Sequence, residues 1–264
     1  MFVMTVKPKA LILIALIATL NPSFTHAQKS KVTYDIYLCI GQSNMAGRGP
    51  LNTALMDTLD GVFLLNSNGV FEPAVNPMNK YSTIRKDIKM QKLSPAYTFG
   101  KEMAKHSKHP IGLVVNARGG SSINSWIKGS KDGYYEEAIR RTRQALAQGG
   151  KLKGIIWHQG EADCGYPESW MILLRQMISD FRHDLGVKHL PVVVGEISQW
   201  EGWAKERGTK RFNNLIKYVD EQIPYVKCAT SEGLGWSIGN HDPHFSTEAQ
   251  LEFGKRYAQK MLEF

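Results

Sequence analysis

Four short stretches of this 264-residue chain carry side chains that could act together in acyl transfer. A serine hydroxyl attacks an ester carbonyl when a histidine takes its proton, and a carboxylate holds that histidine in the required tautomer. Backbone N–H groups beside glycines, and side-chain amides, stabilise the negative charge that forms on the carbonyl oxygen. The chain offers these groups in GQSNMAG with Ser43, ARGGSS with Gly119 and Gly120, HQGEAD with Gln159, and NHDPHF with Asp242 and His244.

Each stretch alone allows a simpler interpretation. Ser43 could merely cap the helix that follows it. The two glycines could form an ordinary turn, and His244 could be a surface histidine. The serine also does not stand in the GxSxG pattern of the α/β-hydrolases, because Met45 occupies the place of the second glycine. The interpretation as one site therefore depends on a fold that brings the four stretches together.

Hydrophobic periodicity predicts such a fold. Short segments rich in Val, Ile and Leu predict buried parallel strands at 34–41, 61–67, 110–117, 152–160, 190–198 and 225–231. Apolar residues at three- and four-residue spacing predict amphipathic helices at 94–107, 134–148, 167–185, 210–222 and 247–262. This alternation predicts an α/β protein, a three-layer α/β/α sandwich with a central parallel sheet and right-handed crossovers. Residues 67–92 show little periodicity and are expected to form a long surface loop.

The order of these elements favours one site. In a sheet of parallel strands, ligands bind beyond the carboxyl ends of the strands. Three of the four stretches follow predicted strands directly, and the fourth lies just before the last predicted helix. We therefore expect the nucleophile, the oxyanion donors and the histidine with its acid to meet at one edge of the sheet.

The blocks GQSNMAG, GGSSI, WHQGEAD and DPHF, with GKRYA after the last, resemble those of the SGNH hydrolase superfamily. The similarity is to its sialate O-acetylesterase-like branch, which includes carbohydrate esterase family 6, and spans about residues 36–257 in the same block order. The resemblance implies a flavodoxin-like sandwich and a serine esterase that removes acetyl groups from sugars. It implies Ser43 as nucleophile and first oxyanion donor, a second donor from Gly119 or Gly120, Gln159 in place of the superfamily's asparagine, and His244 as general base.

The catalytic acid departs from the pattern of this family. Many relatives place an aspartate three residues before the histidine, but here that position is His241, and Asp242 lies two residues before. Either Asp242 reaches Nδ1 of His244, or a backbone carbonyl orients the ring in a Ser/His dyad. We favour Asp242.

Two further classes of function remain open at this stage. A metal-dependent hydrolase would draw its ligands from His158, Glu161, Asp163, His241 and His244. None of these falls in a recognised zinc spacing such as HExxH. A carbohydrate-binding domain that kept the fold and lost the reaction is the other alternative. The serine esterase itself requires no metal and no cofactor.

The expected partner is an acetylated carbohydrate. Arg48 and Arg118 follow two of the catalytic blocks, and a guanidinium group there could bind a carboxylate such as that of sialic acid. Structural ion pairs would explain the same arginines, and a neutral substrate such as acetylated xylan is comparably supported. Four tryptophans could stack on sugar rings or pack in the core: Trp126, Trp200, Trp203 and Trp236.

The N-terminus resembles a secretory leader. Lys7 and Lys9 precede the apolar run 10–20, and THA then ends at Ala27. A run this short does not span a bilayer, so we expect a signal peptide at 1–27 rather than a stable membrane anchor. The esterase domain would then be 28–264, in an exported protein that is periplasmic or extracellular.

Charge and cysteine content exclude some other classes. The net charge of +9 is scattered, without a dense basic block interleaved with aromatic residues, so nucleic-acid binding is not expected. Cys39, Cys164 and Cys228 lack both a CxxC pair and the density of a disulfide scaffold. A single bridge between Cys164 and Cys228 and three free thiols are both open, and the sequence indicates no oligomeric state.

Overall fold

A seven-stranded sheet in the order β3-β2-β4-β1-β5-β6-β7 lies at the centre of residues 32–264. The computed structural model describes residues 1–5, 32–205 and 207–264. The strands are β1 (Tyr34–Gly41), β2 (Val62–Leu65), β3 (Phe71–Pro73), β4 (Ile111–Ala117), β5 (Gly150–His158), β6 (Val192–Gly195) and β7 (Val226–Ala229). All neighbours pair in parallel except β3, which runs antiparallel to β2 at one edge.

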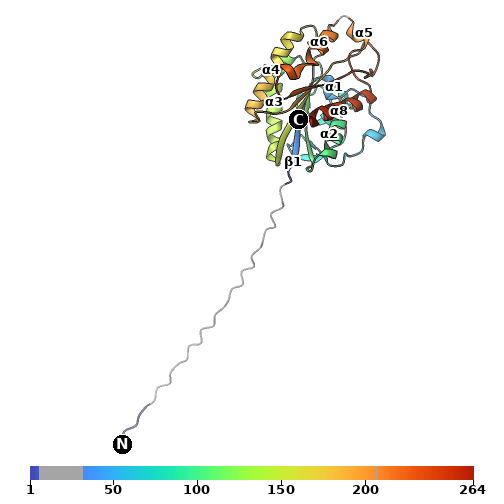
Figure 1. The fold of residues 1–264 in the computed structure, drawn as a ribbon. Helices are drawn as coiled ribbons and strands as arrows, with labels where there is room; N and C mark the ends of the chain where they lie inside the picture. Colours follow the sequence, from blue (N-terminus) through green and yellow to red (C-terminus); the bar gives the residue numbers. More distant parts are fainter. Residues whose placement is uncertain (6–31, 206) are drawn as a thin grey trace. The chain divides into compact units, whose positions relative to one another are not determined.

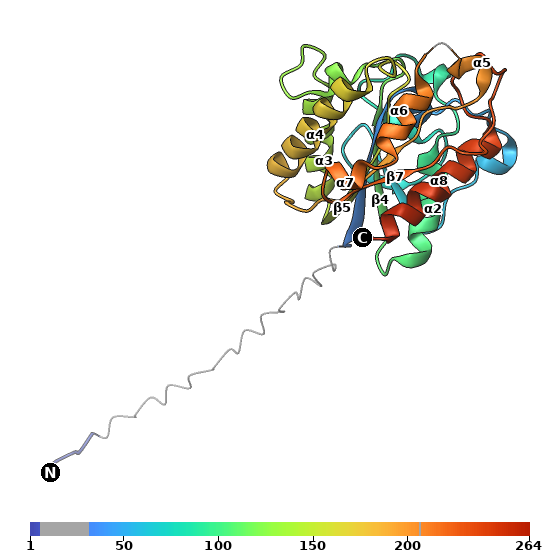
Figure 2. The same ribbon diagram turned by 45° about the horizontal axis from the view of Figure 1, so that its top comes forward.

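Helices cover both faces of the sheet (Figures 1 and 2). On one face lie α2 (Pro95–His106) and α8 (Thr247–Leu262), and on the other lie α3 (Tyr134–Ala147), α4 (Pro167–Asp184), α6 (Thr209–Ile216) and α7 (Val219–Gln222). Short helices α1 (Ser43–Ala46) and α5 (Glu201–Ala204) follow β1 and β6. Four 3-10 turns, η1 (Thr53–Leu55), η2 (Met78–Tyr81), η3 (Ile88–Met90) and η4 (Ile123–Trp126), complete the described elements. The three-layer sandwich expected from the sequence is confirmed.

The register of the central strands aligns the ends that carry the site. Gly41, the last residue of β1, pairs with Ala117 of β4 on one side and His158 of β5 on the other. The three strands therefore stop at the same level. Gly41 has φ of 136°, and a Cβ there would lie 2.1 Å from the backbone oxygen of His158. Only glycine permits this approach.

The two helices on one face cross at a second close approach. At Gly254 of α8, a Cβ would lie 2.4 Å from the carbonyl oxygen of Pro95 and 2.8 Å from the backbone nitrogen of Phe99, both in or at the start of α2. The absence of a side chain at residue 254 therefore lets α8 pack directly on the backbone of α2.

Residues 67–92 differ from the expected surface loop. They contain β3, η2 and η3, and Asn79 and Ser82 are fully buried. The Asn79 side chain accepts a 2.9 Å hydrogen bond from the Ala117 N–H and donates one of 3.1 Å to the Ala117 carbonyl. Polar side chains thus anchor this segment to the end of β4, which is why it shows no apolar periodicity.

Two element boundaries also differ from expectation. The strand expected at 190–198 is confined to β6, because Ile197 hydrogen-bonds the side chains of Asn213 and Ser231 instead of a neighbouring strand. The helix expected at 210–222 is broken into α6 and α7 around Lys217 and Tyr218.

The leader expectation concerns residues that the structure largely does not describe. The apolar run 10–20 and the cleavage point after Ala27 both lie outside the described residues. Among the helices that are described, none has the length and apolarity to cross a membrane. Cys39, Cys164 and Cys228 are all free thiols, so the Cys164–Cys228 bridge is not formed.

Candidate active site

Ser43, His244 and Asp242 form one hydrogen-bonded chain. His244 Nε2 lies 2.9 Å from Ser43 Oγ, and His244 Nδ1 lies 2.7 Å from Asp242 Oδ1. The same Asp242 oxygen accepts a 2.8 Å hydrogen bond from the backbone N–H of His244. A carboxylate two positions before the histidine thus reaches the ring by bending the chain back on itself. This is the arrangement in which a histidine removes a proton from a serine hydroxyl.

The short helix after β1 presents Ser43 to the histidine. Gln42 occupies the N-cap position of α1 and Ser43 is its first residue. The serine side chain therefore does not cap the helix, and its hydroxyl contacts His244 instead. Ser43 is 6% exposed, so its oxygen is accessible only from the cleft described below.

Asn44 ties the serine segment to the histidine segment. Its amide nitrogen donates to the Pro243 carbonyl at 3.1 Å and to Glu161 Oε1 at 2.6 Å. Its oxygen accepts from the Phe245 N–H at 3.2 Å and from Gln250 at 3.2 Å. The residue after Ser43 thus binds the backbone on both sides of His244, which fixes the separation between the two catalytic side chains.

A buried polar chain supports this link from below. Glu161 Oε1 lies 3.1 Å from His158 Nε2, and His158 Nδ1 lies 2.9 Å from the Tyr257 hydroxyl. Tyr257 in turn donates to the Trp157 carbonyl at 3.1 Å. Burial opposes ionisation of Glu161, but His158 and the hydrogen bond from Asn44 outweigh it and lower the pKa of this carboxyl. Glu161 therefore stays ionised and holds Asn44 by a charge-assisted hydrogen bond.

The environment of His244 favours the neutral imidazole. Burial is the largest influence and lowers the pKa of His244, the Asp242 carboxylate opposes this, and the positive charge of Arg48 lowers it further. The net result is a pKa below that of an ordinary histidine. A neutral ring at physiological pH can accept the proton of Ser43.

Two backbone N–H groups near Ser43 are available to an oxyanion. Among the described residues, neither the Ser43 N–H nor the Gly119 N–H has a hydrogen-bond acceptor. A Cβ on Gly119 would lie 3.6 Å from Ser43 Cβ, whereas one on Gly120 would lie 3.5 Å from Lys86 Nζ. Of the two glycines, Gly119 therefore faces the serine.

The geometry corrects the expectation that Gln159 donates to the oxyanion. Its amide nitrogen donates to Asp163, to the Ser121 carbonyl at 3.1 Å and to Gln42 Oε1 at 3.3 Å. Its oxygen accepts a 2.6 Å hydrogen bond from Trp170 Nε1, which can only donate, so the amide cannot be turned around. Gln159 is 1% exposed and has no free donor. The amide of Gln159 is therefore used within the fold.

A cleft of about 440 Å³ opens in front of the catalytic side chains. It is lined by Gln42, Ser43, Arg48, Lys86, Met90, Gly119, Gly120, Glu161, Ala162, Trp203, Arg207, Pro243 and His244. Of the two expected substrate-binding arginines, Arg48 lines the cleft. Arg118 does not, because its guanidinium turns away to donate to the Ile84 carbonyl at 3.0 Å. Three cationic side chains, those of Arg48, Lys86 and Arg207, therefore surround one cleft.

The four candidate tryptophans separate by position. Trp126 is fully buried in the core, which corrects its proposed contact with sugar. Trp200 donates to the Asp242 carbonyl at 3.0 Å and so holds the acid. Trp203 lines the cleft, with Arg207 4.0 Å above its ring. Trp236 is 48% exposed and stands edge-on to Trp200 at 6.2 Å.

The five candidate metal ligands do not come together. His158 and Glu161 bind each other in the buried chain, and His244 contacts Ser43. Nδ1 of His241 lies 3.1 Å from the Gly202 carbonyl oxygen. Asp163 accepts from Ser122 at 2.7 Å. Within the described part of the chain, no three His, Cys, Asp or Glu side chains are grouped as a metal ion would need.

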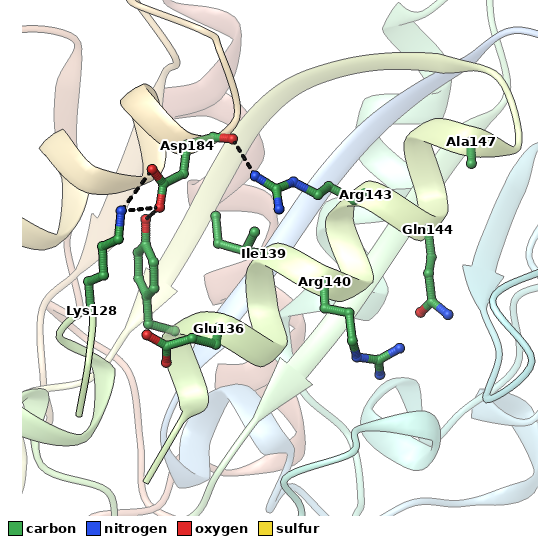
Figure 3. Close-up of a pocket in the computed structure, with 9 residues that line it drawn as sticks. Lys128, Glu136, Ile139, Arg140, Arg143, Gln144, Ala147 and Asp184 are labelled. Carbon is green, nitrogen blue, oxygen red and sulfur yellow. Dashed lines mark hydrogen bonds and ion pairs between the residues drawn. The ribbon is translucent and has the colours of Figure 1, made fainter. Parts of the chain in front are cut away.

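Another cavity, of about 550 Å³, lies along the outer side of α3 and shares no residue with the catalytic cleft (Figure 3). Several of its polar groups converge on Asp184. Lys128 lies 2.8 Å from the Asp184 carboxylate, and Arg143 donates to the Asp184 backbone oxygen at 3.0 Å. No serine or histidine lines it, so it lacks the side chains of the candidate catalytic chain.

A family model described as carbohydrate esterase, sialic acid-specific acetylesterase, matches residues 33–263. The chain belongs to this family. The esterase is 26% identical over 255 residues to a probable carbohydrate esterase of Arabidopsis thaliana, which covers 86% of this chain and 90% of the relative. The resemblance to the sialate O-acetylesterase-like branch is thereby confirmed, and the esterase is a carboxylic ester hydrolase of the carbohydrate acetylesterase type.

Solved structures share the fold of the esterase. An X-ray structure of an Arabidopsis thaliana protein matches the esterase with a TM-score of 0.77 and 25% identity, over 88% of this chain and 98% of that one. The structure of NanS matches with a TM-score of 0.68 and 18% identity, over 89% and 98% of the two chains, and shares the fold. A carbohydrate acetylesterase from Xanthomonas citri matches with a TM-score of 0.57 and 19% identity, over 86% of this chain and 55% of that one.

Sequence reasoning missed three residues of the esterase site. Asn44 stands inside the GQSNMAG block, and its place beside Ser43 was a signal that could have been used. Lys86 comes from the aperiodic segment 67–92, and Arg207 from the segment between α5 and α6. Neither position carries a pattern that would predict its contact with the cleft.

Proposed function

We propose that the esterase removes O-acetyl groups from carbohydrates through an acyl-enzyme on Ser43. The observation that carries this proposal is the chain from Ser43 Oγ to His244 Nε2 and from His244 Nδ1 to Asp242, which opens into a cleft. Membership of a carbohydrate acetylesterase family supports the substrate class. The proposed roles of Ser43, His244 and Asp242 require no metal ion and no cofactor.

In the first half-reaction, Ser43 Oγ bonds to the acetyl carbon while its proton passes to His244 Nε2. The carbonyl electron pair moves onto oxygen, where the N–H groups of Ser43 and Gly119, which have no acceptor among the described residues, stabilise the negative charge. The bond to the sugar oxygen then breaks, and that oxygen takes the proton from His244. Water repeats the sequence on the acetyl-serine and releases acetate. Asp242 stabilises the imidazolium in both halves.

Substitution of the nucleophile tests this mechanism. Ser43→Ala should reduce hydrolysis of p-nitrophenyl acetate to background, whereas Ser125→Ala, outside the cleft, should leave it unchanged. Organophosphonate labelling that is lost in Ser43→Ala would separate an active esterase from a domain that only binds sugars. Normal turnover by purified Ser43→Ala would refute the mechanism.

We further propose that the natural substrate is an acetylated sugar with a carboxylate, as in sialic acid. Arg48, Lys86 and Arg207 surround the cleft, and among the described residues none of the three has an ion-pair partner. Glu161 is the one opposing charge that lines the cleft, and its Oε1 already binds Asn44 and His158. The cleft thus carries an excess of positive charge, which favours an anionic substrate.

Acetate release from O-acetylated sialic acid should be compared with release from acetylated xylan oligosaccharides. Lys86→Met and Arg207→Met should each raise KM for the sialic acid substrate about tenfold and leave the xylan substrate unchanged, because only the former loses an ionic contact. Equal effects on both substrates would favour a neutral sugar.

We also propose that the chain is exported, with cleavage after Ala27. The support is the sequence alone, through Lys7, Lys9 and the apolar run 10–20. N-terminal sequencing of the protein from the culture medium and from the periplasmic and cytoplasmic fractions tests this. A start at Gln28 outside the cytoplasm is expected, and an intact Met1 in the cytoplasm would overturn it.

A further inference from the structure

The oxyanion position lacks the third donor that the sequence predicted. The amide nitrogen of Gln159 donates its hydrogen bonds to Asp163, Ser121 and Gln42. The backbone groups of Ser43 and Gly119 remain. The question is whether another side chain has a free donor at the same place.

Arg48 has such a donor. Its Nη1 donates to the Gly47 carbonyl at 2.7 Å and to the Met90 carbonyl at 2.9 Å, which uses both hydrogens of that nitrogen. Within the described chain, Nη2 has no acceptor and no carboxylate lies within 4.0 Å of the guanidinium. The protein's own backbone therefore holds this group in place before any substrate arrives.

The position of Gly119 shows where Nη2 lies. A Cβ on Gly119 would stand 2.5 Å from Arg48 Nη2 and 3.6 Å from Ser43 Cβ. The free nitrogen thus packs against the same glycine that lies beside the serine. A side chain at position 119 would displace the guanidinium of Arg48 from its place beside Ser43.

From this juxtaposition of Arg48 Nη2, Gly119 and Ser43 we propose that Arg48 is a catalytic residue, whose guanidinium donates a hydrogen bond to the oxyanion. This inference rests on the proposed Ser43 mechanism. As Ser43 Oγ bonds to the acetyl carbon, the carbonyl electron pair becomes a negative charge on oxygen, and Arg48 stabilises it without giving up its proton. When the bond to the sugar oxygen breaks, the charge leaves the carbonyl oxygen and the hydrogen bond weakens again.

A charged donor does more for the transition state than a neutral amide, because the oxyanion gains charge where the substrate carbonyl has little. Burial lowers the pKa of Arg48 and Asp242 raises it, and an arginine so placed remains protonated. The same charge lowers the pKa of His244. Arg48 therefore acts both on the oxyanion that forms when Ser43 attacks and on His244, which takes the proton of Ser43.

The test uses p-nitrophenyl acetate, which has no carboxylate. Arg48→Met should lower kcat about 100- to 1000-fold with KM within about threefold, as expected for loss of an oxyanion donor. Arg48→Lys should recover part of this loss. Guanidinium at millimolar concentration should restore activity to Arg48→Ala. A boronic acid inhibitor, which forms a tetrahedral anion on Ser43, should weaken by a factor similar to the fall in kcat.

Arg85→Met is the matched control. Arg85 also binds a backbone carbonyl in the same segment, that of Ser82 at 2.5 Å, but it does not line the cleft. Its substitution measures the effect of a loosened segment alone and should leave kcat unchanged. If Arg48→Met and Arg85→Met lower kcat equally, the role of Arg48 is only to anchor residues 82–90.

The other outcomes are also decisive. Wild-type kcat for Arg48→Met on p-nitrophenyl acetate, with KM raised only for acetylated sialic acid, would make Arg48 a carboxylate-binding residue and overturn the inference. Should Arg48→Met fail to fold, two other results decide instead: the partial activity of Arg48→Lys and the rescue of Arg48→Ala by guanidinium. The absence of both counts against the inference. Full activity in Ser43→Ala would overturn the proposed mechanism itself, which is a separate result.

Discussion

The side-chain amide of Asn44 donates a 3.1 Å hydrogen bond to the carbonyl oxygen of Pro243, across 199 positions of sequence. Through this contact the segment that carries the nucleophile holds the segment that carries the base. The distance between Ser43 and His244 is therefore set by a neighbour of each, and not only by the hydrogen bond between them.

Replacement of Asn44 should uncouple the two segments. Asn44→Ala should lower kcat about 10- to 100-fold with little change in KM, because Ser43 and His244 lose their fixed separation. Stability should also fall by about 2–4 kcal/mol, since buried partners are left unsatisfied. Steady-state kinetics and urea unfolding provide the measurements. Asn213→Ala, which removes two comparable buried hydrogen bonds to Ile197, should lose stability but keep kcat. Equal kcat in both variants would argue against a positioning role for Asn44.

Replacement of Gln159 should affect folding more than chemistry. Gln159→Ala leaves the Trp170 N–H and the Ser121 carbonyl without partners. We expect about 2–4 kcal/mol of destabilisation, and a kcat per folded molecule within about tenfold of wild type. Urea unfolding monitored by fluorescence, with kinetics well below the transition, measures both. A kcat reduced about 100-fold or more at unchanged stability would restore Gln159 as an oxyanion donor.

The pH profile should report the environment of His244. Its lowered pKa predicts that kcat/KM holds constant below the pH at which an ordinary histidine titrates, and falls only as the more acidic pKa is crossed. Asp242→Asn removes the largest of the influences that raise the pKa of His244, so the acid limb should move to still lower pH. The same variant should lose about 10²- to 10⁴-fold in kcat, because the ring is no longer held in its tautomer. An acid limb that moves to higher pH would show that Asp242 does not act on this histidine.

A side chain at Gly41 should separate the central strands. In Gly41→Ala, the new Cβ would meet the His158 carbonyl oxygen at 2.1 Å, in a backbone conformation that alanine rarely adopts. We expect a loss of about 3 kcal/mol or more, and with it the common level of β1 and β5. Gly233→Ala shares a positive φ but meets no atom within 4 Å, so it should cost only about 1–2 kcal/mol. Similar unfolding midpoints for both variants would mean that the strand contact relaxes freely.

The sequence predicts the fold because buried parallel strands leave uninterrupted apolar runs, and amphipathic helices leave a regular period. It predicts candidate catalytic residues because Ser43 and Gly119 come shortly after the ends of strands and His244 shortly before the start of a helix. The role of Gln159 was not predictable from the sequence. Its amide could donate either to the oxyanion or to acceptors within the fold, and only the three-dimensional distances decide between them. Lys86 and Arg207 reach the cleft from segments without period, where nothing in the local sequence determines direction.

The crossing of α8 over α2 at Gly254 bears on when the enzyme becomes active. Ser43 follows the first strand, whereas His244 lies just before α8, the last of the described helices. Gln250 of α8 donates a hydrogen bond to Asn44, the residue after Ser43, so α8 docks where the base meets the nucleophile. The time course of acetate release during refolding should therefore report the docking of α8, and should lag behind any signal that reports formation of the sheet.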